Sequence, residues 1–225
     1  GTDVLLRFDL QDEFQIKDIL FYVALGIGTG LASVYFSKIF FKINGFFDRF
    51  KSPIKKLIVG GVAIGFMLYF IPPLFGEGYG LINNLLIGDH AAAIGNVPFF
   101  DHLTENIWVI IVLLIGITLF KAIAMTTTFA AGGVGGIFIP TLVMGSVLGN
   151  AFAKIINNIG LDFHVSESNF TLIGMTGLMA GVLHAPLTAI FLIAEITGGY
   201  ELFVPLMLVS AISFLFTRYF ISHSI

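Results

Sequence analysis

The chain has 225 residues, of which 57% are hydrophobic and 11% are charged, and its mean hydropathy is +0.98. Ordinary soluble domains are about 45–50% apolar and about 25% charged, so this composition argues against a soluble protein and favours one embedded in a lipid bilayer. The net charge of −3 gives no reason to expect a nucleic-acid partner, and the lack of cysteine excludes disulfide bonds. We therefore expect an all-α, polytopic membrane protein.

The first quarter of the chain predicts a loop followed by a long membrane helix. Residues 1–16 are mixed and acidic, and the apolar run over 17–44 exceeds the roughly 20 residues that a span needs. Six of the chain's eleven Lys and Arg residues then fall within 19 positions. They are Lys38, Lys42, Arg49, Lys51, Lys55 and Lys56. Since Lys and Arg bias short loops toward the cytoplasm, we expect this loop on the inner side, the alternative being a merely solvated helix end.

A second apolar helix, 57–71, ends at Pro72-Pro73 and returns the chain to the outer side, so that residues 17–71 form two helices. The region 72–104 is rich in Gly and Asn and poor in basic residues, which predicts an outer loop or re-entrant region with one short helix near 80–88.

The segment 105–129 is the clearest membrane-spanning helix that the sequence predicts. Lys121 lies near its far end, where its ammonium can reach the interface or helix C-terminal carbonyls.

From residue 130 onward, glycines and prolines interrupt the apolar pattern repeatedly. They separate the predicted helices 169–183, 187–197 and about 201–221, of which 187–197 is too short to cross about 30 Å of hydrocarbon. Irregular backbone at membrane depth occurs only where it is buried in protein or lines a wet cavity. Broken helices near the middle of the bilayer are a recurring ion-binding device in transporters.

The hexapeptide GGIFIP, residues 135–140, is the clearest of these interruptions. Gly135 and Gly136 permit backbone angles that are closed to other residues, and Pro140 is tolerated in the first turn of a helix. We expect a helix to start near 137–140, with unpaired N–H groups and a partial positive charge that attract an anion. The alternative is a tight helix crossing, which the pair Gly145-xxx-Gly149 would support.

The side chains of this motif offer no hydrogen-bond donor, because Ile137, Phe138 and Ile139 are all apolar. An anion here would be held by backbone N–H groups inside an apolar shell. A fixed Lys or Arg would hold the ion more tightly than transport allows, since conduction needs binding weak enough to let the ion leave.

Several ordered motifs resemble the CLC family of chloride channels and chloride/proton antiporters. GGIFIP is similar to the family's G-x-F-x-P signature, the segment from GMTGLMAG to ELFVPLM resembles the stretch that follows it, and GEGYGLI resembles a glycine-rich turn upstream. The resemblance covers about 18–225. It implies an integral membrane protein, in a plasma or inner membrane, that transports chloride, and in the antiporters protons, without a cofactor and without enzymatic chemistry.

The resemblance also implies roles for particular residues of this sequence. The backbone N–H groups of Ile137 and Phe138 would hold the central chloride, Ile139 would face the outer site, and Gly136 and Pro140 would shape the turn. The family forms homodimers, each subunit having its own pore built from two inverted halves. This chain resembles the second half, so 105–225 would supply pore-forming and dimer-interface helices. Candidate interface residues are Leu187, Phe191 and Phe203.

The departures from the family pattern limit what this chain can do by itself. The family's G-S-G-I-P loop with its chloride-binding Ser, and its G-R-E-G-P loop with its gating Glu, do not occur in this sequence. The resemblance puts the pore Tyr just beyond Ile225 and the inner proton-transfer Glu in the other half. We therefore expect a single transmembrane domain fragment, 1–225, that holds one wall of a chloride site. The sequence does not distinguish a channel from an antiporter, and it does not show whether a regulatory domain follows residue 225.

Other functions have weaker support in the sequence. The G-Y-G at 78–80 is reminiscent of a potassium filter but lacks the T-V that precedes such a filter, and the glycines at 26–30 suit helix packing better than a nucleotide fold. Glu195 lies within an apolar helix and is a functional candidate by default, although pairing with backbone or Tyr is the simpler reading. An intramembrane hydrolase built from Ser146, His184 and Glu195 lacks a nucleophile motif. A further alternative is a fragment of a membrane protein that serves dimerisation or scaffolding and does not transport ions.

Overall fold

The computed structural model describes residues 16–94, 106–160, 163–197 and 200–221, and it contains helices but no strand within these ranges. The predicted loop 1–16 lies almost wholly outside them. The elements, with η marking a 3₁₀ helix, are η1 (Ile16–Asp18), α1 (Ile19–Phe47), α2 (Pro53–Phe70), η2 (Pro72–Leu74), α3 (Tyr79–Leu86), α4 (His90–Ile94), α5 (Ile107–Ala130), α6 (Phe138–Asn158), α7 (Glu167–Leu183), α8 (Pro186–Thr197) and α9 (Phe203–Phe220).

Helices of spanning length follow from the long apolar runs. In the described part of the chain, five are long and apolar enough to cross a membrane, namely those built on α1, α2, α5, α6 and α9. Asn106 caps α5, because its side-chain oxygen accepts a hydrogen bond from the Trp108 N–H at 3.0 Å. The second helix begins at Pro53 rather than at 57, since proline suits the first turn of a helix.

The region expected on the outer side, 72–104, differs from its prediction. Its described residues, 72–94, contain η2, α3 and α4, whereas the sequence predicts a single short helix near 80–88. Gly78 starts α3 in the left-handed conformation, with φ of 89°. The Asp89 carboxylate then accepts a hydrogen bond from the Ala92 N–H at 2.9 Å and so caps α4. A five-residue helix is too short to give a periodic pattern in the sequence.

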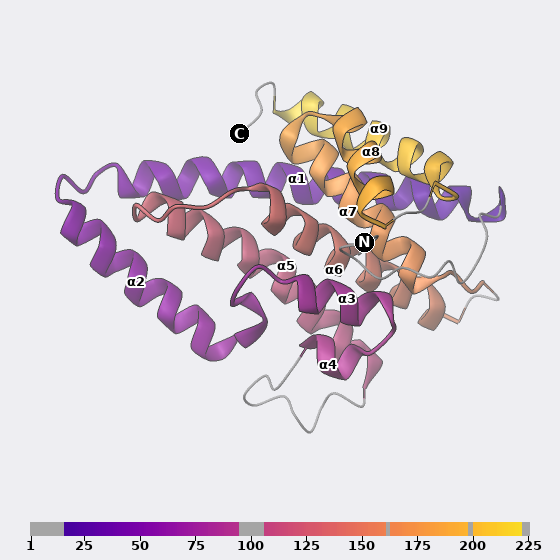
Figure 1. The fold of residues 1–225 in the computed structure, drawn as a ribbon, viewed down its shortest axis with the longest axis horizontal. Helices are drawn as coiled ribbons and strands as arrows, with labels where there is room; N and C mark the ends of the chain where they lie inside the picture. Colours follow the sequence, from indigo (N-terminus) through magenta and orange to yellow (C-terminus); the bar gives the residue numbers. More distant parts are fainter. Residues whose placement is uncertain (1–15, 95–105, 161–162, 198–199, 222–225) are drawn as a thin grey trace, which may run out of the picture.

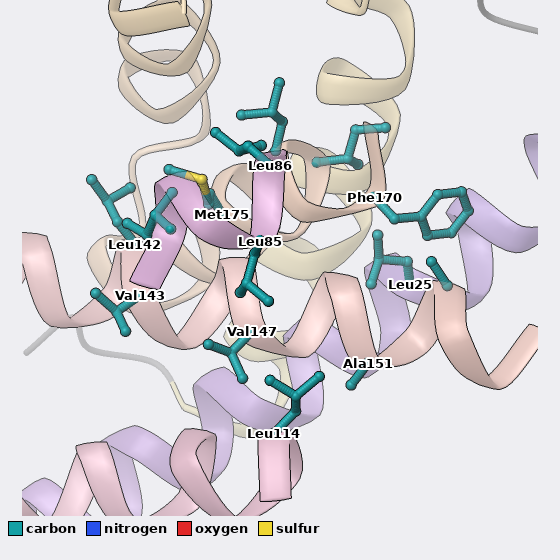
Figure 2. Packing of buried hydrophobic residues seen from close by; sticks show 14 of the residues in the cluster. Leu25, Leu85, Leu86, Leu114, Leu142, Val143, Val147, Ala151, Phe170 and Met175 are labelled. Atoms are coloured by element: carbon teal, nitrogen blue, oxygen red, sulfur yellow. The ribbon is translucent and has the colours of Figure 1, made fainter. Parts of the chain in front are cut away.

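The centre of the molecule is the pair α6 and α7, which pack on each other more extensively than any other pair of elements. Glycine makes this approach possible, since a Cβ added to Gly145 would lie 2.5 Å from the carbonyl oxygen of Gly174. Figure 2 shows α6 side chains such as Val147 surrounded by residues of neighbouring helices, among them Leu85 of α3 and Leu114 of α5. The buried α6 is therefore held in place by the helices around it.

The close contact between α1 and α9 confirms the packing role for Gly26 and Gly30, whereas a Cβ on Gly28 would meet nothing within 4 Å. A Cβ on Gly26 would meet Ile212, and one on Gly30 would meet Phe216, each at 2.9 Å, so α1 and α9 touch along these positions. Figure 1 shows α1 running along most of the length of the molecule, with α7, α8 and α9 gathered over one part of it.

Candidate anion site

The glycine segment, residues 132–136, begins directly after the C-terminus of α5. Gly132 adopts the left-handed conformation with φ of 101°, and its N–H donates to the carbonyl of Phe129 at 2.9 Å. The Gly133 N–H donates to the carbonyl of Thr128 at 2.8 Å. These two bonds form a Schellman motif, which satisfies carbonyls left open at the end of a helix. A Cβ on Gly133 would lie 2.8 Å from the Thr128 oxygen, so glycine is needed here for close approach.

Between the end of α5 and the start of α6, the glycine segment reverses the direction of the chain. Figure 1 shows the segment returning from the end of α5 as an extended trace, so that α6 starts partway along the molecule rather than at its end. Ile137 is the N-cap residue, and the first backbone bond runs from the Thr141 N–H to the Ile137 carbonyl at 3.2 Å. Pro140 lies in the first turn, as the sequence predicts.

The start of α6 leaves backbone donors without a partner. Within the described ranges, no hydrogen bond is found from the N–H groups of Ile137, Phe138 and Ile139, and no side chain caps the helix. Unpaired N–H groups and the helix dipole together give this end a partial positive charge. The Thr141 hydroxyl donates to the Phe138 carbonyl at 2.6 Å, and among the described residues it accepts no hydrogen bond from these N–H groups.

The three side chains of this turn are half-buried in two different apolar clusters. Ile137 packs against the cluster that contains Phe36 and Met144, whereas Phe138 and Ile139 pack against the main core. This anchoring fixes the backbone and keeps the turn apolar. The arrangement can therefore present N–H groups to a small anion with no fixed countercharge from these side chains.

A cavity of about 280 Å³ lies beside the glycine segment, and Gly135, Gly136 and Pro140 form part of its wall. Lys121 of α5 also lines it and is only 4% exposed. Its ammonium donates to the carbonyls of Leu74 and Gly76, at 3.0 Å each. Of the alternatives for this lysine, binding to carbonyls is therefore confirmed: Leu74 is the last residue of η2, and Gly76 lies in the turn that follows it.

Sequence reasoning did not place Lys121 next to the glycine segment. None of the described residues that line the cavity is acidic, so this lysine brings a positive charge to the neighbourhood of the anion site. The available signal was its position inside an apolar span, since an ionisable residue within a membrane helix marks a functional or structural site by default.

The three predicted interface residues come together at the surface of α8 and α9. Leu187 is 69% exposed, Phe191 is exposed as well, and the rings of Phe191 and Phe203 lie 5.6 Å apart. This cluster is about 50 residues away in sequence from the α6 start, and its role in dimer formation stays a prediction.

The alternative functions find no matching geometry. The G-Y-G at 78–80 caps and starts α3 and is therefore not an extended filter. The Ser146 hydroxyl donates to the Val143 carbonyl of its own helix at 2.8 Å and is fully buried, which does not suit a nucleophile. Glu195 is exposed and accepts a hydrogen bond from Tyr200 at 3.1 Å, which confirms the simpler reading and raises the pKa of Tyr200.

Comparisons with known sequences point to one family. The family described as voltage gated chloride channel matches residues 1–218. The H(+)/Cl(-) exchange transporter ClcA of Salmonella agona (strain SL483) is 29% identical over 217 residues, covering 92% of this chain and 41% of the transporter. The ClcA of Salmonella newport (strain SL254) is 29% identical over 213 residues with the same coverage. The chain thus spans about two-fifths of the length of these relatives.

Solved structures show the same fold. A CLC-type fluoride/proton antiporter superposes with a TM-score of 0.70 at 17% identity, over 95% of this chain and 47% of the antiporter. A slow cyanobacterial Cl-/H+ antiporter gives a TM-score of 0.70 at 21% identity, over 98% of this chain and 48% of that one. Family match, fold and apolar helices agree: the chain belongs to the voltage-gated chloride channel (CLC) family of multi-pass integral membrane proteins.

Proposed function

We propose that this chain forms one half of a chloride transport pathway, in which the start of α6 binds the ion. The observation that carries the proposal is the set of unpaired backbone N–H groups at Ile137, Phe138 and Ile139, whose side chains are half-buried in apolar clusters. Membership of the family and the exchanger names of the relatives support the same conclusion.

The mechanism follows from the character of these donors. Backbone N–H groups replace part of the water around chloride, and the positive end of the α6 dipole compensates the ion's charge. Neither contribution is a full countercharge, so the ion is bound and can still leave, as transport requires. Lys121 adds a positive charge nearby, and its bonds to the Leu74 and Gly76 carbonyls keep it from pairing directly with the ion.

We further propose that a first inverted half completes the site within a longer protein of a plasma or inner membrane. This agrees with the match to about two-fifths of each relative. The longer protein is proposed to work as a homodimer, with Leu187, Phe191 and Phe203 at the contact between subunits.

Paired ion fluxes test this function. The full-length protein is reconstituted in liposomes under a chloride gradient, and chloride and proton movements are recorded together. Chloride efflux that drives protons uphill would support exchange, as the names of the relatives suggest, and chloride efflux without protons would support a channel. If no anion moves, the transport proposal is wrong, and the glycine segment serves helix packing alone.

A further inference from the structure

The hairpin between α1 and α2, residues 38–56, is the most basic part of the chain. It contains six basic residues and one acid, Asp48, which gives a net charge of +5. Asp48 lies 3.6 Å from Lys56. The other five basic side chains have no ion-pair partner among the described residues and are exposed to solvent. They are Lys38, Lys42, Arg49, Lys51 and Lys55.

Helix length places this hairpin at the level of the lipid headgroups. The first 20 residues of α1, from Ile19 to Lys38, are enough to cross about 30 Å of hydrocarbon. At about 1.5 Å per residue, the rest of the helix, up to Phe47, extends beyond that layer. The exposed aromatic side chains of Phe41 and Phe46 lie among the lysines, as suits an interface between water and hydrocarbon.

Local helix stability does not explain where these charges lie. Lys38 and Lys42 are four residues apart on one face of α1, where like charges repel. Lys55 and Lys56 lie in the first turn of α2, at the positive end of the dipole, where acidic residues would be favoured and none is present. Both arrangements cost stability in isolation, and a bound anion would relieve both.

An apolar groove begins one turn below Lys55. It has a volume of about 620 Å³ and is lined by six residues of α2, from Ile58 to Met67, together with Ile123 and Thr127 of α5. The α2 residues recur at intervals of four, so they form one face of the helix, and Lys55 lies on that face three positions before Ile58. The groove therefore runs from the basic hairpin toward the middle of the bilayer.

We propose that this combination is a binding site for an anionic phospholipid. The phosphate of the headgroup would lie against Lys51, Lys55 and the N-terminus of α2, and one acyl chain would fill the groove between α2 and α5. Basic clusters next to a membrane helix attract anionic lipids, and the groove supplies the apolar contact that a soluble phosphate would lack. The site is separate from the start of α6 and does not depend on the proposed chloride transport.

The test measures lipid binding to the delipidated full-length protein by native mass spectrometry. Phosphatidylglycerol and phosphatidylcholine with identical acyl chains are titrated against wild type and a triple variant, Arg49→Gln, Lys51→Gln and Lys55→Gln. Wild type is expected to prefer phosphatidylglycerol, and the triple variant to lose about tenfold in apparent affinity, equivalent to about 1.4 kcal/mol. Equal binding of the two lipids by wild type, or unchanged binding by the triple variant, would overturn the proposal.

Three further variants distinguish the contributions of positive charge, of the intact fold and of the apolar groove to lipid binding. Lys17→Gln removes an exposed lysine at the opposite end of α1 and is expected to leave binding unchanged, as is the charge-preserving pair Lys51→Arg and Lys55→Arg. Ala63→Phe fills the groove without changing charge and is expected to weaken phosphatidylglycerol binding. Unaltered binding in Ala63→Phe would refute the acyl-chain site. Displacement of the lipid by millimolar glycerol phosphate would indicate a soluble-anion site instead.

Discussion

Among single residues, Gly145 in α6 and Gly136 just before that helix are glycines for different physical reasons. A Cβ on Gly145 would lie 2.5 Å from the Gly174 carbonyl, so this glycine is required by packing. A Cβ on Gly136 would meet no atom of the chain within 4 Å, and its φ is not in the left-handed region. The space at Gly136 is therefore left open beside the donors that we assign to chloride.

Gly136→Val should weaken chloride binding in the full-length protein without loss of stability. The branched side chain would occupy space next to the N–H groups of Ile137 and Phe138, and we expect the chloride dissociation constant to rise by about tenfold, or about 1.4 kcal/mol. Isothermal titration measures this. Gly145→Ala is the matched control, in which the melting temperature should fall because of the contact with α7. A wild-type chloride titration in Gly136→Val would contradict the assignment of the site.

Lys121→Met should destabilise the turn after η2. The substitution keeps an unbranched side chain but removes both hydrogen bonds to the carbonyls of Leu74 and Gly76, leaving one buried and one partly buried acceptor without this donor. Such losses cost about 1–3 kcal/mol. Thermal unfolding of the full-length protein should show the decrease, and Lys17→Met, at an exposed lysine, should not. Equal melting temperatures for the two variants would show that the Lys121 bonds carry no stability.

At the scale of elements, polar pairs hold the far end of the α6–α7 hairpin. The Lys154 ammonium lies 2.6 Å from the Glu167 carboxylate, and Asn150 donates to the Thr171 hydroxyl at 3.1 Å. Asn157 exchanges two hydrogen bonds with the backbone of Val165, at 2.8 and 3.0 Å. These contacts fix the position of α6 along α7, and so they help to position the N-terminus of α6.

A double-mutant cycle on Lys154 and Glu167 should show unequal single effects. Lys154 is 1% exposed, whereas the Glu167 side chain is 27% exposed, so Glu167→Gln leaves the more deeply buried charge without its carboxylate. We expect Glu167→Gln to cost about 3 kcal/mol and Lys154→Met less. The double variant should cost less than the sum of the two, as measured by chemical unfolding in detergent. Additive effects would mean that the pair is not coupled.

The sequence allows the breaks between elements to be predicted better than the contacts across them. Glycine and proline mark the end of α5, the start of α6 and the boundaries of α8, because their backbone preferences are local. The short α4 gives no periodic signal. The contacts of Lys121 with Leu74 and of Lys154 with Glu167 join residues that are 47 and 13 positions apart, and no local pattern reveals such partners.

At the scale of the whole molecule, the apolar surface is unevenly distributed. α7 is buried along nearly its whole length, whereas α2 and the outer faces of α8 and α9 carry many exposed apolar side chains. Such surfaces suit contact with lipid, with the other half of a longer chain, or with a second subunit. For the cluster at Leu187, Phe191 and Phe203, the contact with a second subunit stays a prediction.

The pair Leu187→Trp and Phe203→Trp should shift the full-length protein toward monomer. Two bulky indoles would disturb the complementarity of a surface that already packs Phe191 against Phe203 at 5.6 Å. Sedimentation or single-molecule photobleaching in membranes measures the change. Val112→Trp, at an exposed position of α5, is the matched control. An unaltered dissociation constant for the pair would argue against this interface.

Anomalous diffraction can show whether backbone N–H groups at the start of α6 hold the transported ion. Crystals of the full-length protein grown in bromide should show an anomalous peak within hydrogen-bonding distance of the Ile137 and Phe138 N–H groups. The peak should be weaker in Gly136→Val. If bromide is transported but no peak occurs at this helix start, the ion is bound elsewhere and the account of GGIFIP as an anion site is wrong.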